Sequence, residues 1–521
     1  MTIYVILIVY IAIMLGIGFY CRRHSKDVSG FVLGGRNLGG WITAFAYGTS
    51  YFSAVVFIGY AGQFGWNFGV AATWIGLGNA FIGSLLPWII LGNRTRVMTK
   101  ELNASTMPEF FEKRYNSKNL KTVSALIVFI FLIPYTASVY NGLSRLFESA
   151  LNVPYEICII AMAALTAVYV ITGGYMATAI NDFVQGLVML GGISAVVFAV
   201  LNKQGGFTAA LQKLGEIENG VPANTLNTLF GPDPINLLGV VILTSLGTWG
   251  LPQMVQKFYA VKDKSAVSKG SIISTIFALV VAGGSYFMGG FGRLFGSTDP
   301  AEAAETGRTL IQTAGGKPVF DSIVPAMLKS ALPELLIGIV VVLVLSASMS
   351  TLSSLVLTSS STLTIDLIKP RMGKKMTDKK QVLVMRGLII FFVVISVVIA
   401  LNPNTYISTM MSISWGALAG AFLAPFLYGL FSKKITKAAC AGSFILGVGI
   451  TVGHMVIFSL GLFPELTKAA AALPLNLASP INAGAAAMII TLIAVPLISL
   501  VTKVKDTEYV DKIFADCKNF K

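Results

Sequence analysis

A run of hydroxyl side chains interrupts an otherwise apolar stretch of this chain. The run reads LSASMSTLSS at positions 345–354 and follows LLIGIVVVLV at 335–344. Ala347, Ser350, Thr351 and Ser354 are spaced i, i+3, i+4 and i+7, so they share one face of a helix. Neutral oxygens in such a stripe suit a small hard cation such as sodium. The alternative is that these hydroxyls only allow close helix packing and bond their own backbone.

One acid lies alone in a long apolar region. Asp182 is the only acidic residue between Glu156 and Glu216, some turns into the apolar segment that begins near Met176. An ionisable group inside a membrane is costly and therefore suggests a functional site. The alternative is a helix cap, formed together with Asn181, near the cytoplasmic surface.

Two apolar segments carry helix-breaking residues at mid-length. The segment 41–66 contains AYGTSYFS at 46–53, and the segment 237–258 contains TSLGTWGLP at 244–252, with two glycines and a proline. Broken backbone at membrane depth is tolerated only where it lines a cavity or a site. Two such breaks at corresponding places in two halves indicate an inverted-repeat transporter, whereas each alone is also compatible with an ordinary kink.

The composition identifies a membrane protein. Of 521 residues, 55% are apolar and only 12% are charged, about half the charge of a soluble protein. About thirteen segments are apolar and long enough to cross a bilayer. These predicted spans are 2–20, 41–64, 70–92, 122–147, 155–174, 178–201, 235–258, 271–293, 334–366, 383–401, 405–431, 437–461 and 482–503.

The distribution of charge predicts the topology. Basic residues directly follow the first span and recur in every second loop, so the N-terminus is expected outside and the C-terminus inside. The net charge of +15 is thereby assigned to cytoplasmic loops facing anionic lipid, and no nucleic-acid partner is expected. Four scattered cysteines and two histidines indicate neither a disulfide framework nor a zinc site. One buried acid is too little for catalysis, so we expect no enzyme.

Several short motifs, taken together, resemble one family. They are FVLGGRNLG at 31–39, TMPEFFEKRY at 106–115, SRLFES at 144–149, TGGY at 172–175, NDFVQ at 181–185, GLP at 250–252, MSTLS at 349–353 and SISWG at 412–416. In this order the chain resembles, over nearly its whole length, the sodium:solute symporter family, which includes bacterial proline and pantothenate permeases. The resemblance implies an all-α membrane protein with the LeuT-type inverted repeat of five helices and an extra leading helix.

The expected organisation follows from that resemblance. It comprises a leading helix and cytoplasmic loop at 1–40, a first repeat at 41–201, an extracellular loop at 202–234, a second repeat at 235–431, and two accessory helices with a cytoplasmic tail at 432–521.

The resemblance also implies site residues. A first sodium site would use backbone carbonyls of Thr49, Phe52 and Ala347 and the hydroxyls of Ser350 and Thr351. A possible second sodium site would use Asp182, Ser353 and Ser354; members that use one sodium lack the last serine. For the solute, aromatic and polar residues near the two breaks are the candidates: Ser53, Gln63, Tyr135, Trp249, Pro252 and Trp415.

Two positions depart from the family's proline transporter. Tyr51 stands where that protein has an aspartate, and Thr244 stands where it has a tryptophan. Both differences weaken the case for proline, so the identity of the solute and the number of sodium ions stay open.

The predicted function is sodium-coupled import of a small polar organic solute by alternating access. The solute would be an amino acid such as proline or a carboxylate such as pantothenate, and Na⁺ the coupling ion. The alternative is a sodium-responsive sensor or channel on the same fold. The expected location is a bacterial-type inner or plasma membrane, with a lipid bilayer around a functional unit of one chain.

Overall fold

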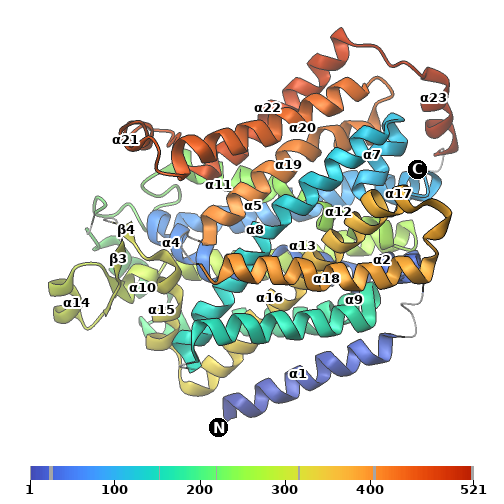
Figure 1. Ribbon diagram of the computed structural model, residues 1–521. Helices are drawn as coiled ribbons and strands as arrows, with labels where there is room; N and C mark the ends of the chain where they lie inside the picture. The colour runs from blue at the N-terminus through green and yellow to red at the C-terminus, as the bar shows by residue number, and fades with distance from the viewer. Residues whose placement is uncertain are drawn as a thin grey trace.

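The protein is a bundle of roughly aligned helices (Figure 1). The computed structural model describes residues 2–22, 27–151, 153–218, 220–314, 317–402 and 407–517. Strands in this part of the chain are confined to one outer region. They are β1 (Gly296–Ser297), parallel to β2 (Thr309–Leu310), and β3 (Thr313–Ala314), antiparallel to β4 (Lys317–Pro318). The prediction of a helical membrane protein is therefore confirmed.

The helices vary widely in length. The long ones are α1 (Thr2–Cys21), α8 (Lys118–Leu151), α9 (Tyr155–Lys203), α13 (Lys264–Gly289), α16 (Glu334–Thr362), α18 (Asp378–Ala400), α19 (Ile407–Phe431), α20 (Lys437–His454) and α22 (Pro480–Val501). Shorter helices include α2 (Val28–Leu33), α5 (Thr73–Ala80), α6 (Asn93–Glu101), α7 (Met107–Tyr115), α10 (Phe207–Gly215), α14 (Pro300–Thr306), α15 (Ile323–Ala331), α17 (Lys369–Met372), α21 (Pro464–Ala471) and α23 (Thr507–Asp516). Single turns complete them: η2 (Gly34–Arg36), η4 (Gly69–Ala72), η5 (Phe81–Leu85), η6 (Trp88–Gly92), η8 (Gly292–Leu294), η9 (Phe320–Ser322), η10 (Leu363–Ile368), η11 (Gly373–Lys375) and η12 (Met455–Ser459).

By length and composition, nine helices of the described chain are able to cross a membrane, or ten when one bent pair is counted as a span. This number is smaller than the thirteen predicted spans, partly because one continuous helix covers two neighbouring predicted spans in some places. The 49 residues of α9 would measure about 74 Å if straight, more than twice the thickness of a bilayer core. Its backbone leaves the helical region at Gly174, with φ 56° and ψ −151°.

Contacts with α1 show that α9 folds back at Gly174. A Cβ on Gly18 would lie 3.2 Å from the Cβ of Tyr169, and the Asn181 side chain donates to the Met14 carbonyl at 3.4 Å. Met14 and Gly18 are one helical turn apart, whereas Tyr169 and Asn181 would be about 18 Å apart on a straight helix. The two arms of α9 therefore correspond to the separately predicted spans 155–174 and 178–201.

The first predicted break is confirmed. Helix α3 (Gly40–Tyr51) ends, and the chain continues after two non-helical residues into η3 (Val55–Tyr60) and α4 (Ala61–Phe68). Phe52 has an extended backbone, with φ −111° and ψ 104°. Carbonyls of the last turn of α3 consequently lack the amide partners that a continuous helix would supply.

The second predicted break is confirmed as well. Helix α11 (Pro234–Leu246) continues through the turn η7 (Gly247–Trp249), and α12 (Pro252–Ala260) begins at a bend of 41°. Pro252 occupies the first turn of α12, where a missing N–H costs nothing, and it prevents the preceding helix from continuing.

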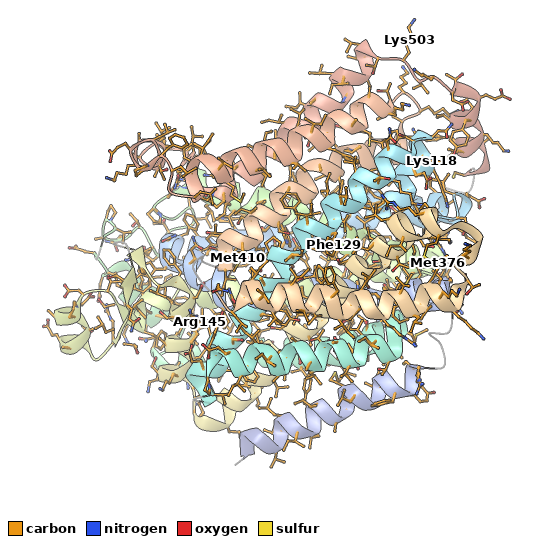
Figure 2. All side chains as sticks on the ribbon, viewed as in Figure 1. Lys118, Phe129, Arg145, Met376, Met410 and Lys503 are labelled. Atoms are coloured by element: carbon orange, nitrogen blue, oxygen red, sulfur yellow. The ribbon has the colours of Figure 1, made fainter. Side chains whose placement is uncertain are left out.

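The two ends of the bundle differ. The N-terminus lies at the end that carries α10, α14 and α15, and the C-terminus lies at the opposite end, near α17 and α23 (Figure 1). Figure 2 shows Lys118 and Arg145 at opposite ends of α8, with Lys503 toward the Lys118 end. Lys118 and Lys503, which belong to two of the lysine-rich segments, therefore lie at the same end.

Glycines bring α4 against α13 at backbone contact. A Cβ on Gly65 would overlap the backbone of Gly289, and a Cβ on Gly289 would overlap the carbonyl of Ala61. This close approach fixes the helix that follows the first break onto a neighbour, as small residues do in membrane proteins.

Gly289→Ala should therefore lower the thermal unfolding midpoint of the detergent-solubilised protein. Overpacking of this kind costs about 1–3 kcal/mol. Gly283→Ala is the matched control, because the new methyl group on the same helix would meet no atom within 4 Å. Equal losses in the two variants would contradict this account of the α4–α13 contact.

Candidate functional site

Four of the five oxygens predicted for the first sodium site converge between α3 and α16. The Ser350 hydroxyl donates to the carbonyls of Thr49 at 2.9 Å and Ala347 at 3.0 Å. The Thr351 hydroxyl lies 3.2 Å from the Ala347 carbonyl and 3.5 Å from that of Thr49. All four residues are fully buried.

The break in α3 explains why the Thr49 carbonyl is available. In a continuous helix it would accept from the amide of Ser53, but Ser53 is already outside the helix. Phe52 lies at the break and is buried, with its ring stacked on Tyr51 at a centroid distance of 4.2 Å. The carbonyl of Phe52 remains a predicted ligand.

This group of oxygens suits a weakly held monovalent cation. Each hydroxyl has lone pairs besides its proton, so an oxygen that now donates to a carbonyl also has the capacity to bind a metal ion. Carbonyl and hydroxyl oxygens are hard ligands, and none of the five residues carries a charge. A site without formal charge favours reversible binding.

A lysine is present where the second sodium was predicted. Lys257 Nζ lies 3.6 Å from Asp182 Oδ2 and donates to Ser354 Oγ at 2.9 Å. Ser353 instead donates to the carbonyl of Ser350 at 2.9 Å. Asp182 is fully buried within α9, so the interpretation of Asp182 as an interfacial helix cap is wrong.

Sequence reasoning missed Lys257, although a signal was available. It is the only charged residue between positions 235 and 260, inside a predicted span. The argument that singled out Asp182 applies to it equally. Because the two residues are 75 positions apart in the sequence, their pairing was not predictable from it.

The ion pair is held in a dry environment. The side chains of Lys257 and Asp182 are 2% and 0% exposed, and the Lys257 ammonium also lies 5.2 Å from the ring centre of Tyr175. Opposite charges at about 4 Å attract by about 4 kcal/mol at an effective dielectric constant of about 20. Desolvation costs several kcal/mol per ion, so each charge depends on the other rather than adding much net stability.

Ser50 connects the neutral oxygens to the ion pair. Its carbonyl lies 3.4 Å from the Thr351 hydroxyl, and its own hydroxyl lies 2.8 Å from that of Ser354. Ser350 and Ser354 are one turn apart on α16. The two predicted ion sites are therefore adjacent and share a continuous set of hydrogen bonds.

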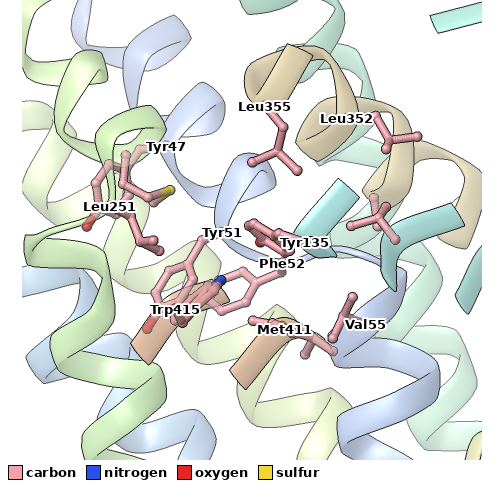
Figure 3. Packing of buried hydrophobic residues seen from close by; sticks show 14 of the residues in the cluster. Tyr47, Tyr51, Phe52, Val55, Tyr135, Leu251, Leu352, Leu355, Met411 and Trp415 are labelled. Atoms are coloured by element: carbon pink, nitrogen blue, oxygen red, sulfur yellow. The ribbon is translucent and has the colours of Figure 1, made fainter. Parts of the chain in front are cut away.

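Aromatic side chains fill the space between the two breaks (Figure 3). The ring of Trp415 meets that of Tyr135 edge-on at 5.9 Å and stacks on Tyr51 at 6.1 Å. The Tyr135 hydroxyl and the Trp415 indole N–H are buried near each other and near Ser53, but in the described part of the chain neither forms a hydrogen bond of good geometry. Buried donors normally find acceptors, so this pair is suited to a ligand with acceptor oxygens.

The other predicted solute residues are distributed more widely. Ser53 is buried at the first break and accepts from the Val55 amide at 3.2 Å, and Pro252 begins α12. Trp249 donates to the carbonyl of Ile82 at 2.9 Å, so its polar atom is engaged with η5. Gln63 lies on α4, about 15 Å along the chain from Ser53.

The two positions that depart from the family's proline transporter contact each other. The Tyr51 hydroxyl donates to the carbonyl of Thr244 at 2.6 Å, joining α3 to α11. Tyr51 and Thr244 therefore lie at one place in the structure, beside the Tyr135–Trp415 pair.

A buried acid lies beside the second half of the first broken helix. Asp321 of η9 accepts from the amide of Ile407, the first residue of α19, at 3.4 Å. A Cβ on Gly59 of η3 would lie 3.6 Å from the same carboxyl group. Burial raises the pKa of Asp321 to about 6, although the Ile407 amide and the charge of Arg145 act to lower it.

Comparison with known proteins gives a consistent result. A model of the sodium:solute symporter family matches residues 31–447. The osmoregulated proline transporter OpuE of Bacillus subtilis is 28% identical over 84% of this chain and 86% of that protein. The sodium/proline symporter of Escherichia coli is 29% identical over 87% and 88%. A substrate-bound, outward-open sodium-coupled sialic acid symporter has a TM-score of 0.71 over 96% of this chain and 98% of that chain, at 16% identity, which shows a shared fold.

The raised pKa of Asp321 predicts a pH-dependent stability. The folded value of about 6 exceeds the unfolded value of about 3.9. The resulting contribution of Asp321 to the free energy of unfolding is fully present below about pH 4 and is lost as the pH rises through 6. This contribution is at most about 3 kcal/mol. The thermal unfolding midpoint in detergent should therefore fall between pH 5 and pH 7, and less so in Asp321→Asn.

Asp299→Asn is the control, since Asp299 is exposed in the same outer region and asparagine keeps its role at the start of α14. An unchanged pH profile in Asp321→Asn would contradict the assignment.

Proposed function

The chain belongs to the sodium:solute symporter family, and we propose that it imports a small solute bearing a carboxylate group together with sodium. It is a multi-pass plasma-membrane transporter rather than an enzyme, and Na⁺ is its coupling ion. The observation that carries the proposal is the convergence of Thr49, Ala347, Ser350 and Thr351 at the break in α3. We assign the first sodium to these oxygens and to the carbonyl of Phe52.

The proposed solute site lies beside this ion site. The unpartnered donors of Tyr135 and Trp415 would bind a carboxylate, with Ser53 and Pro252 at the two breaks. Gln63 and Trp249 are retained as outlying candidates. Relatives named as proline transporters support an amino acid as the solute. Because Tyr51 and Thr244 differ from the residues of the family's proline transporter, another carboxylate, such as pantothenate, is the second candidate.

The proposed topology has thirteen spans with the N-terminus outside and the C-terminus inside. Its support is that Lys118 and Lys503, from two lysine-rich segments, lie at the same end of the bundle. The repeats would comprise residues 41–201 and 235–431, each beginning with a broken helix. The proposed functional unit is a single chain.

In the proposed cycle, sodium ties the broken α3 to α16 and favours an outward-open state. Solute binding then allows the inward-open state, in which low cytosolic sodium empties the site. Sodium raises the affinity for solute by the same factor as solute raises the affinity for sodium. The membrane potential adds about 2.3 kcal/mol per charge for each 100 mV.

Uptake by proteoliposomes tests this function. The purified protein would be offered a radiolabelled panel of neutral amino acids, pantothenate and other small carboxylates, and sugars, with and without an inward sodium gradient. We expect one carboxylate-bearing class to accumulate only with the gradient. Accumulation that ignores sodium would contradict the proposal, and accumulation of sugars alone would contradict the solute class.

The first sodium site predicts a specific loss in Ser350→Ala and Thr351→Ala. Each variant removes one ligand oxygen, so the sodium concentration for half-maximal uptake should rise about tenfold, equivalent to about 1.4 kcal/mol. Ser348→Ala is the matched control, because Ser348 is buried on the same helix but donates to Val344 of its own backbone. A similar rise in the control would argue for a general effect on α16.

Tyr135→Phe separates solute binding from ion binding. Removing the unpartnered hydroxyl should raise the KM for solute about tenfold, because a hydrogen bond to a charged group is worth about 1.5–3 kcal/mol. The sodium dependence at saturating solute should change much less. A change in the sodium dependence alone would move Tyr135 out of the solute site.

A further inference from the structure

We propose that the ammonium group of Lys257 is a built-in cation that occupies the second ion site, so that each transport cycle carries one sodium. This inference rests on the proposed function and specifies its stoichiometry. The presence of Ser354 beside Asp182 would otherwise leave room for two ions. The position of Lys257 decides between these alternatives.

The ligands of the second site are already engaged. Lys257 Nζ approaches Asp182 at 3.6 Å and donates to Ser354 at 2.9 Å. The Ser354 hydroxyl is also hydrogen-bonded to that of Ser50 at 2.8 Å, and Ser353 is directed to the Ser350 carbonyl. A sodium ion would therefore have to displace the ammonium group to reach these oxygens.

The charge balance points in the same direction. Asp182 is fully buried, and in the described part of the chain Lys257 is the cation recorded against its carboxylate, so Lys257 is its compensating charge. A sodium ion added to this pair would place two positive charges on one carboxylate, away from water. Buried charge is tolerated when it is paired one to one.

The three participants belong to different elements. Lys257 lies on α12, after the second break, whereas Asp182 lies on α9 and Ser354 on α16. A lysine remains covalently attached when the helices move, whereas a sodium ion in the same place would be released inside. In this proposal the lysine stays with the protein through the cycle, and the neutral first site is the one that exchanges ions.

The number of sodium ions in the wild-type protein is the direct test. In proteoliposomes, the membrane potential that just prevents net solute flux, measured at several sodium gradients, gives sodium ions and charges per solute. For an electroneutral solute we expect one of each. A value of two would overturn this inference while leaving sodium-coupled transport intact, whereas sodium-independent uptake would overturn the proposed function itself.

Stability without any solute provides a second measurement. The thermal unfolding midpoint would be titrated with NaCl, with choline chloride holding the ionic strength constant. The wild-type protein should follow a curve for one sodium ion. Lys257→Met should be less stable without sodium, and sodium should restore its stability along a steeper curve for two ions, because a bound ion stabilises the folded state by mass action.

Two further variants complete the test. Lys257→Arg keeps a cation on α12 and should follow the one-ion curve. The double variant Lys257→Met with Asp182→Asn lacks both charges and should lose the steeper component. A Lys257→Met protein that follows the one-ion curve, or a wild-type protein that binds two ions, would overturn the proposal. If Lys257→Met does not fold even in high sodium, the sodium expected to replace the ammonium has failed to do so, which also counts against it.

Discussion

The membrane interior offers no water to an interrupted backbone, and the arrangement of this protein follows from that constraint. The break after Tyr51 removes the helical partner of the Thr49 carbonyl, and the hydroxyl of Ser350 replaces it at 2.9 Å. A broken helix in hydrocarbon must be covered by another element that brings polar atoms. We propose that the same polar atoms that satisfy the backbone also bind the coupling cation.

The same constraint acts on charge and produces a second kind of site next to the first. Around Thr49 the oxygens are neutral, which suits an ion that must leave again. One helical turn along α16, Ser354 accepts a hydrogen bond from Lys257, which is paired with the buried Asp182. Ser50 contacts Thr351 at the neutral oxygens and Ser354 beside the ion pair. In our proposal the neutral site exchanges its cation, and the paired charge beside it holds a permanent one.

Much of this arrangement was predictable from local features. The polar patch at 46–53 and the Gly/Pro run at 244–252 predicted both breaks, because glycine and proline act on the backbone where they occur. The stripe of Ser350 and Thr351 predicted the oxygen-bearing helix from its period alone. Contacts between distant neighbours were not predictable in this way. Trp249, expected at the solute, donates to Ile82, and the partner of Asp182 was not anticipated.

The sequence by itself therefore determined the class of protein, the two interruptions and the helix face that carries the hydroxyls. These are set by hydrophobicity, by backbone freedom and by the 3.6-residue period, all of which act over a few positions. Only the tertiary structure decided which oxygens meet at the break in α3, that α9 folds back at Gly174, and that Lys257 reaches Asp182. Those outcomes depend on how separate helices pack against one another, and packing joins residues whose distance along the chain carries no information about their distance in space.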